Sequence, residues 1–486
     1  MDQGRDMLDI RNIAVGKHFT LIGPTTSING VYLGPFYYYF NLFPFLFSKG
    51  NPAAILYWQV IWFQLSVGVL WWVIKKYSPL LALLTAVILL LAPTFFYQNR
   101  YAWTANAAPI FVTFFFSSLL WLLYKKTLPK AFLTGLIAGA VFQIEAAFGI
   151  FLAPFAILFL LYRKSNIKII FFLFSGFSTT LIPQFLFELR HNFVMTHTFL
   201  NEITGASSIL GDKLSIPNTL ISHFLNFTYI THGFFILPNL FSQYFFLLAL
   251  IYLFIKLRNH KFTENMSLVF LLSIIFIIFA YFFYSFYLYP IKGWYLNGLY
   301  IPFAIILAFF FKDLLESSKK LVSISSLVLI LGLLFINIFS QINQIPQDST
   351  TRSGDRSNIR NELEAIDWVY QKANGQGFKV FNYIPSVYDY PYQYLFWWYG
   401  ESKYGYRPTV ISYLENVPEY IQNNTSFLTN TRSLNNNYPT FLIMEKDHDM
   451  PIRQYAWLGN FTKLCKLESK IFPWETEIQM LQQCQK

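Results

Sequence analysis

The sequence predicts a polytopic α-helical membrane protein that ends in a small α/β domain. Its 486 residues are 55% hydrophobic and only 13% charged, whereas soluble globular proteins carry roughly 25% charged residues. Apolar runs of about 20 residues, the length that crosses a bilayer, recur between residues 53 and 340. From about Gln341 the hydrophobicity drops and polar turn residues appear, which indicates a change of solvent as well as of fold.

About ten transmembrane helices are expected from the apolar runs. They lie near 53–74, 79–97, 108–124, 130–147, 149–162, 168–187, 239–257, 266–286, 297–312 and 321–340. When the chain is threaded alternately through a bilayer, the basic clusters of the short loops all fall on one side, at 75–76, 125–126, 163–168, 256–261 and 312–320. Cytoplasmic loops carry such an excess of Lys and Arg. Both termini and three long connections (1–51, 98–106 and 190–238) are therefore expected outside.

The net charge of +11 does not indicate a nucleic-acid partner, because much of the excess lies in these short turns, where topology explains it. The protein is expected in the cell membrane, with its first loop and its carboxyl-terminal domain extracytoplasmic. The expected organisation is a first outer loop at 1–52, a transmembrane domain at 53–341 and an extracytoplasmic α/β domain at 342–486.

The first outer loop contains an apolar stretch at 36–47. If this stretch crossed the bilayer, Lys75 and Lys76 would move outside, so an interfacial or re-entrant helix is expected instead. The charged residues before it have no segment that would export them except the helix at 53–74. Two interpretations remain: the chain begins outside, or a preceding helix is missing from this sequence. The second is favoured.

The carboxyl-terminal region is expected to form helix and sheet. Residues 358–371 have helical periodicity and are followed by Gly375 and Gly377. Strands are expected at 378–384, 439–444 and, more weakly, 463–472, with an exposed asparagine-rich loop at 423–437. Cys465 and Cys484 would face an oxidising compartment, where both a disulfide and free thiols fit the sequence.

The amino-terminal segment contains a group of acidic residues that are candidates for a functional site. At helical pitch Asp2, Asp6 and Asp9 form one stripe, with Arg5 beside it. One interpretation is a surface helix with a solvated acidic face. The other is a site for chemistry on a lipid-borne substrate, because these carboxylates lie beside a bilayer and precede an aromatic loop.

Several short motifs resemble the GT-C membrane glycosyltransferases, which include the protein O-mannosyltransferases and the lipid A aminoarabinose transferases. The motifs are DQGRD at 2–6, LIGP at 21–24, GPFYYY at 34–39, RYAWTAN at 100–106 and FELRH at 187–191. With the helix count and the outer domain, the resemblance covers nearly the whole chain.

The resemblance implies transfer of a sugar from a polyprenyl-phosphate carrier to an acceptor, with inversion at the anomeric carbon. It implies that Asp2 is the general base and that Asp6 assists it. The chain departs from the family at two positions: Gln3 stands where the family often has a second acid, and Asn106 stands at an acidic position of the second loop. Asn106 can bind substrate by hydrogen bonds but cannot take a proton.

A leaving lipid phosphate needs cations as its charge grows. Arg5 is expected to contact the donor phosphate, and Arg100, Arg190 and Lys292 are further candidates on the outer side. The competing interpretation of the arginines is nonspecific anchoring to lipid headgroups.

Two other polar residues are candidates for substrate binding. Glu145 lies in an apolar helix and either lines the donor cavity or simply faces water. His191 either contacts substrate or serves the end of its helix. The histidines lack zinc spacing, so no metal and no cofactor is expected beyond the lipid-linked sugar itself.

The function expected from the sequence is thus an inverting membrane glycosyltransferase. Its partners would be membrane lipids, the polyprenyl-phosphate sugar and an acceptor glycan, lipid or protein. The alternative is a transporter or flippase of glycan lipids that makes no bond; such proteins often have repeated halves, and no repeat is evident here. A catalytically dead relative that only binds glycan lipid also fits the departures at Gln3 and Asn106.

Overall fold

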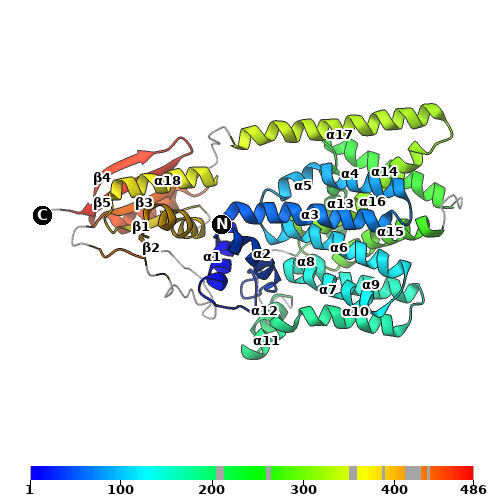
Figure 1. The fold of residues 1–486 in the computed structure, drawn as a ribbon, viewed down its shortest axis with the longest axis horizontal. Coiled ribbons are helices and arrows are strands. Elements are labelled where there is room, and N and C mark those ends of the chain that lie inside the picture. Colours follow the sequence, from blue (N-terminus) through cyan, green and yellow to red (C-terminus); the bar gives the residue numbers. More distant parts are fainter. Residues whose placement is uncertain are drawn as a thin grey trace. The chain divides into compact units, whose positions relative to one another are not determined.

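The computed structural model (Figure 1) describes residues 2–203, 213–258, 264–349, 358–385, 389–410, 428, 430–434 and 438–484. The chain divides into two compact units. We call the first the mixed unit; it comprises Met1–Phe19, Asn41–Ala54 and Asn343–Lys486. We call the second the helical unit; it comprises Thr20–Phe40 and Ile55–Ile342. The expected first loop at 1–52 is therefore shared between the two units.

The helical unit consists of helices that run largely side by side in Figure 1. In chain order they are α3 (Pro52–Ile74), α4 (Pro79–Leu91), α5 (Pro93–Gln98), α6 (Thr104–Tyr124), α7 (Leu128–Ile144), α8 (Ala146–Gly149), α9 (Leu152–Tyr162), α10 (Ile167–Thr180), α11 (Ile182–Arg190), α12 (Val194–Ile203), α13 (Ile216–Tyr229), η1 (Ile230–Gly233), α14 (Asn239–Arg258), α15 (Glu264–Tyr284), η2 (Gly293–Leu299), α16 (Tyr300–Leu315) and α17 (Lys320–Ser349).

The lengths and composition of these helices are those of a multi-pass membrane protein. Among the described residues, five helices are long and apolar enough to cross a membrane, and the bent pair α10–α11 would make a sixth. Shorter apolar helices lie at Pro79–Leu91, Leu128–Ile144, Ala146–Tyr162 and Leu240–Lys256. Each of the ten expected segments thus corresponds to an apolar helix or helix pair.

Three segments that were expected to be single continuous helices are interrupted or bent. The segment expected at 79–97 is broken at Ala92, whose backbone is extended because Pro93 follows it. The segment expected at 168–187 bends by 52° between α10 and α11, beside Pro183. The helix expected at 130–147 ends at Ile144, and Glu145 has a non-helical backbone before the short α8 begins.

Close packing between α7 and α10 depends on glycine. A Cβ atom on Gly135 would lie 1.9 Å from the carbonyl oxygen of Leu173, and one on Gly176 would lie 2.1 Å from that of Phe132. Small residues of this kind let helices approach closely inside membrane proteins.

The mixed unit combines helices with one sheet. Its helices are α1 (Asp2–Ala14), the second half of α2 (Phe36–Phe47), α18 (Ile359–Ala373), α19 (Tyr390–Leu395), η3 (Phe396–Gly400), α20 (Glu401–Tyr404), α21 (Pro451–Leu458) and η4 (Gly459–Phe461). Its strands are β1 (Lys379–Tyr383), β2 (Thr409–Val410), β3 (Thr440–Glu445), β4 (Leu464–Ile471) and β5 (Thr476–Gln483).

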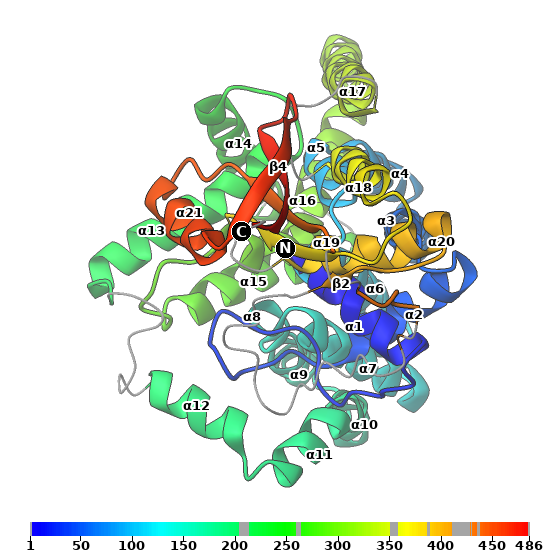
Figure 2. The same ribbon diagram turned by 90° about the vertical axis from the view of Figure 1, so that its left-hand side faces the viewer.

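The sheet has the order β2-β1-β3-β5-β4. Strand β1 is parallel to β2 and β3, whereas β5 is antiparallel to both β3 and β4. All six residues of the central strand β3 are buried, because both faces of the sheet are covered. Phe441 packs on Trp368 of α18, and the next residue, Leu442, belongs to a cluster that includes Trp457 of α21. Figure 2 shows α18 and α21 on opposite sides of the sheet.

The expected elements of this domain are largely confirmed. The helix expected at 358–371 is α18, whose first turn is capped by the Asn358 side chain at 3.0 Å from the Arg360 amide. It ends at Ala373 and is followed by Asn374, which has a left-handed backbone and directly precedes Gly375. The three expected strands are β1, β3 and β4, whereas β2 and β5 were not expected. Most of the loop expected at 423–437 lies outside the described residues.

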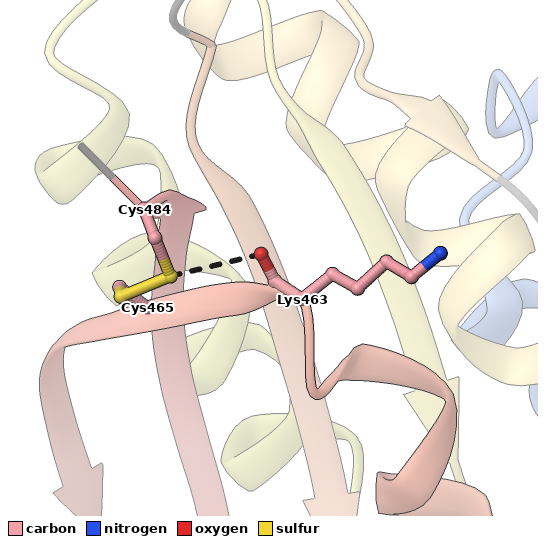
Figure 3. The surroundings of a disulfide bond; sticks show 3 residues. All are labelled: Lys463, Cys465 and Cys484. Atoms are coloured by element: carbon pink, nitrogen blue, oxygen red, sulfur yellow. Dashed lines mark hydrogen bonds between the residues drawn. A yellow bond between two sulfur atoms is a disulfide. The ribbon is translucent and has the colours of Figure 1, made fainter. Parts of the chain in front are cut away.

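Cys465 and Cys484 form a disulfide, which decides between the two states that the sequence left open. Cys465 lies on β4 and Cys484 follows β5 directly, with a Cα–Cα distance of 5.0 Å (Figure 3). The bond joins the edge strand β4 to its neighbour near the carboxyl terminus.

Candidate functional site

The predicted site residues fall into both units. Asp2, Arg5 and Asp6 belong to the mixed unit. The helical unit contains Arg100, Asn106, Glu145, Arg190, His191 and Lys292.

The first group is a compact acid–arginine cluster on α1. The guanidinium of Arg5 lies between two carboxylates, with Nη1 3.2 Å from Oδ1 of Asp2 and Nη2 2.9 Å from Oδ1 of Asp6. Its Nε donates a second hydrogen bond to the same Asp6 oxygen, at 3.0 Å. Helical spacing places Asp2 on the same face as Arg5 and Asp6, which lie three and four residues further on, whereas the contact of Arg5 with Asp6 joins adjacent residues. We call these three residues the α1 cluster.

The two carboxylates of the α1 cluster have different environments. Asp6 is only 3% exposed, and its Oδ2 has no hydrogen-bond partner within the described part of the chain. Burial raises the pKa of Asp6 to about 7, although the nearby Arg5 opposes the shift. The Asp2 side chain retains 29% exposure. The interpretation of α1 as a helix with a solvated acidic face is therefore wrong for Asp6.

In the helical unit, the first-loop residues 20–40 are held by Gln143 at the end of α7. The Gly34 amide donates to the carbonyl oxygen of Gln143, and the Phe36 amide donates to its Oε1, both at 3.2 Å. The Gln143 amide group in turn donates to the carbonyl of Thr180 on α10. A buried side chain at the end of two apolar helices thus fixes the start of α2.

Lys292 lies against the same first-loop segment. Its Nζ donates to Oγ of Ser27 at 3.1 Å, and Ser27 is also 3.2 Å from the hydroxyl of Tyr295. The ammonium group lies 5.3 Å from the centre of the Trp294 ring, within range of a cation–π interaction. The side chain is exposed, so its charge remains accessible to an anion.

Glu145 occupies the non-helical break between α7 and α8 and is 7% exposed. The hydroxyl of Tyr284 joins this break to the segment that carries Lys292, because it lies 2.9 Å from the carbonyl oxygen of Ala147 and 3.1 Å from that of Tyr295. The structure therefore brings the segments of Glu145 and Lys292 together.

The second predicted loop joins this arrangement. Trp103 packs edge-on against Trp294 with 5.2 Å between ring centres, and Nδ2 of Asn297 donates to the carbonyl of Ala105 at 2.9 Å. Arg100 lies over the Phe96 ring at 5.0 Å, and Nδ2 of Asn106 donates to the Tyr101 carbonyl at 3.1 Å. The segments that carry Arg100, Asn106, Glu145 and Lys292 are thus linked by direct contacts.

Arg190 and His191 lie at the carboxyl end of α11. Arg190 is exposed. The His191 ring stacks on Phe187 at 4.0 Å, and its Nδ1 lies 2.8 Å from the Phe187 carbonyl. Phe187 also contacts Tyr32 of the first loop, with ring centres 6.3 Å apart. His191 therefore has a structural role at this helix end, and its role in substrate binding stays a prediction.

The motif FELRH at 187–191 contains one more polar residue with a clear structural role. The carboxylate of Glu188 accepts hydrogen bonds from the amides of Met195 and Thr196, both at 2.9 Å. These amides belong to the first turn of α12, where backbone donors lack helical partners. Glu188 therefore caps α12.

Ser27 was missed by the sequence reasoning. Ser27 lies 265 residues from Lys292 in the chain, and neither residue belongs to a recognisable motif. A serine after a turn and a tyrosine near a membrane boundary are both common, so only the folded chain indicates their contact. Within the described ranges, no group of three His, Cys, Asp or Glu residues is arranged to hold a metal ion.

Comparison with known proteins finds similarity to a solved structure. No protein-family model matches the chain, and no curated protein matches it. Among solved structures, it is similar to ArnT from Cupriavidus metallidurans, a GT-C aminoarabinose transferase whose crystal structure was determined bound to undecaprenyl phosphate. The sequences are 10% identical, the TM-score is 0.59, and the match covers 99% of this chain and 93% of ArnT. The chain therefore has an ArnT-like fold over nearly its whole length.

Proposed function

We propose that this protein is an inverting membrane glycosyltransferase that moves a sugar from a polyprenyl-phosphate carrier to an acceptor at the outer face of the cell membrane. The observation that carries the proposal is the α1 cluster, two carboxylates bridged by one arginine, on a chain with the fold of ArnT. That enzyme was crystallised with undecaprenyl phosphate, which supports a lipid phosphate as leaving group here.

In the proposed reaction Asp2 is the general base. It takes the proton of the acceptor hydroxyl as the acceptor oxygen bonds to the anomeric carbon. The bond from that carbon to the phosphate oxygen breaks at the same time, and polyprenyl phosphate leaves with the electron pair. Asp2 suits this role better than Asp6 because it is the more exposed of the two, so that an acceptor can reach it. A positioned base contributes roughly 10²–10⁴-fold to such a step.

Asp6 and Arg5 support the base. Asp6 holds the Arg5 guanidinium by two hydrogen bonds to one oxygen, and Arg5 reaches Asp2 with another nitrogen. This arrangement fixes the position of the Asp2 carboxylate through its contact with the Arg5 guanidinium. In this mechanism Arg5 orients the base, and any contact with the donor phosphate comes in addition.

Lys292, Arg100 and Arg190 are the proposed phosphate contacts. Lys292 has the strongest support, because it lies at the junction of the first loop, the Glu145 break and η2. An ammonium group with an exposed side can stabilise the growing charge of the leaving phosphate. Glu145 and Asn106 would contact the sugar or the acceptor by hydrogen bonds.

The outer location of the site is supported by the charge of the short loops and by the disulfide. Disulfides persist in oxidising compartments and are rare in the cytosol. Cys465 and Cys484 belong to the same unit as the α1 cluster. One compartment therefore contains the disulfide and the proposed base.

The test is sugar transfer by protein reconstituted in liposomes and supplied with a panel of undecaprenyl-phosphate sugars. Release of undecaprenyl phosphate is the readout, since it requires no knowledge of the acceptor beyond a supplied envelope extract. We expect Asp2→Asn to lose about 10²–10⁴-fold in kcat, whereas Asp449→Asn, an exposed carboxylate of the same unit, retains wild-type turnover. Full turnover by Asp2→Asn would exclude it as the base.

The same liposomes distinguish the rival function. A flippase moves the intact undecaprenyl-phosphate sugar between leaflets and releases no undecaprenyl phosphate. Movement of the lipid at wild-type rates by both aspartate variants, without bond cleavage by any of them, would replace the transferase proposal.

A further inference from the structure

Gly4 lies on α1 between Asp2 and Arg5 of the α1 cluster, and it touches the backbone of α19. A Cβ atom at this position would lie 2.5 Å from the Pro391 nitrogen, 2.8 Å from the Pro391 Cα and 2.8 Å from the Tyr390 carbonyl carbon. Real Cβ atoms do not approach backbone atoms so closely, and the backbone cannot swing aside as a side chain can. Only glycine lets α1 lie this close to α19.

A second contact holds α1 further along the same face. Arg11 follows Gly4 by seven residues, or two helical turns. Its guanidinium is buried and lies 5.5 Å from the centre of the Trp397 ring in η3. Trp397 also stacks on Phe45 of α2, with ring centres 6.1 Å apart. The continuous segment of α19 and η3 therefore contacts α1 at two points.

The start of α19 is itself fixed to the sheet by a buried carboxylate. Asp389 is 2% exposed and directly precedes α19. Its Oδ2 accepts from Nδ2 of Asn382 on β1 at 2.9 Å, and its Oδ1 accepts from Nε2 of Gln393 at 2.6 Å. A buried carboxylate with two such bonds is costly to disturb. A chain of contacts thus runs from β1 through α19 to α1.

We propose that α19 and η3 are the surface that positions the α1 cluster, with Gly4 and Asp389 as positioning residues. The proposal rests on the proposed function of that cluster. Its consequence is that the carboxyl-terminal sheet domain sets the geometry and the hydration of Asp6 and Arg5. Gly4 and Asp389 do this without contacting the substrate themselves.

The hydration of Asp6 gives this proposal a distinctive readout. The charged groups near Asp6 on its own helix are Arg5, Asp2 and Asp9. The titratable residues of α19 are the tyrosines at positions 390, 392 and 394, and tyrosine is ordinarily neutral near pH 7. Burial is the largest cause of the raised pKa of Asp6, so a displaced α1 lowers that pKa by admitting water.

The first experiment measures hydrogen–deuterium exchange of the α1 amides in the full-length protein in detergent. Alanine has a higher helix propensity than glycine, so Gly4→Ala by itself would slow exchange. If α19 positions α1, the clash displaces the helix and exchange becomes at least about tenfold faster. The matched control is Gly459→Ala, since a Cβ atom at Gly459 meets nothing within 4 Å. Unchanged or slower exchange of α1 in Gly4→Ala would overturn the proposal.

The second experiment measures kcat against pH for wild type, Gly4→Ala and Asp389→Asn. Ionised Asp6 holds Arg5 better than protonated Asp6 does, so wild-type kcat should fall below about pH 7. Both variants should reduce kcat at least about tenfold. They should also move the acidic limb of the pH profile, where kcat falls, to lower pH by about one unit. A merely structural loss lowers the amount of active enzyme and leaves the limb in place, which would also contradict the proposal.

The two experiments separate this inference from the proposed function. The exchange measurement needs no activity, so it decides the positioning contact even where no donor is turned over. Suppose that α1 exchanges faster in Gly4→Ala than in wild type, but folded wild-type protein cleaves none of the undecaprenyl-phosphate sugars. This result would contradict the transferase function alone. Asp389→Asn provides a second variant if Gly4→Ala does not fold.

Discussion

Arg5 holds Asp6 through two nitrogens, Nε at 3.0 Å and Nη2 at 2.9 Å, both on the same carboxylate oxygen. The second oxygen of Asp6 is buried and has no hydrogen-bond partner in the parts of the chain that the structure describes. The pair is therefore asymmetric: one oxygen fixes the guanidinium, and the other favours a bound proton.

Arg5→Lys should lower kcat about tenfold or more while leaving the protein folded. A lysine ammonium is a single point charge, so it cannot donate from two fixed nitrogens to Asp6 and from a third to Asp2. The measurement is turnover of the best undecaprenyl-phosphate sugar by reconstituted protein. Arg432→Lys, at an exposed arginine of the same unit, is the control and should match wild type. Equal turnover by both variants would show that the fork geometry is unimportant.

Asp6→Asn should reduce activity and yet gain stability relative to wild type as the pH rises. The pKa of Asp6 is raised from 3.8 in the reference state to about 7 in the fold. Between these values the folded state keeps a proton that the unfolded state releases, so wild-type stability falls from pH 4 to pH 7 and is level above. The full effect is about 4 kcal/mol at most. Asparagine does not titrate and avoids this loss.

The measurement is the difference in Tm between Asp6→Asn and wild type in detergent at pH 5 and pH 8. The difference should increase in favour of the variant at pH 8. A difference that is constant with pH would mean that Asp6 has an ordinary pKa in the folded protein.

Lys292→Met should raise KM for the lipid-linked donor about tenfold, because it removes a cation that the first loop holds in place through Ser27. Ser27→Ala should have a smaller effect in the same direction, since the lysine remains but loses its partner. Lys319→Met changes an exposed lysine in a predicted cytoplasmic loop and serves as the control. If all three variants bind the donor equally, Lys292 is not a donor contact.

The carboxyl-terminal domain should be reachable only from outside the cell. The two native cysteines are joined in a disulfide, so an engineered cysteine is the only expected reactive thiol. Ile452→Cys, at a residue that is 84% exposed, should react with an impermeant maleimide in intact cells. Ile167→Cys, 71% exposed in a predicted cytoplasmic loop, should react only after permeabilisation. The opposite pattern would contradict the proposed orientation.

Much of the fold was predictable because it depends on local composition. The membrane-spanning segments were found from the length of the apolar runs, and the helix at 358–371 was found from its periodicity. The break at Glu145 was not, because the residues around it have no proline, and its backbone is set by neighbouring segments. The strand β5 was also missed. Its sequence TEIQMLQQ is largely polar, and it is a strand because β3 and β4 lie on either side of it.

The site was only partly predictable for the same reason. The contact between Arg5 and Asp2 follows from helical spacing and could be expected. The burial of Asp6 could not, because it depends on the rest of the fold, and α19, against which α1 packs, lies almost 400 residues away in the chain. Likewise the contact of Lys292 with Ser27 joins two segments that carry no common sequence signal.

The sequence by itself determined the class of this protein, the approximate position of its apolar helices and the identity of the acidic motif. These follow from hydrophobicity and from the helical repeat, which act over about 20 residues. The tertiary structure decided which carboxylate is buried, which arginine nitrogen meets which oxygen, and which distant segments meet the first loop. These depend on packing between segments far apart in the chain, where a single missing Cβ at Gly4 permits the approach.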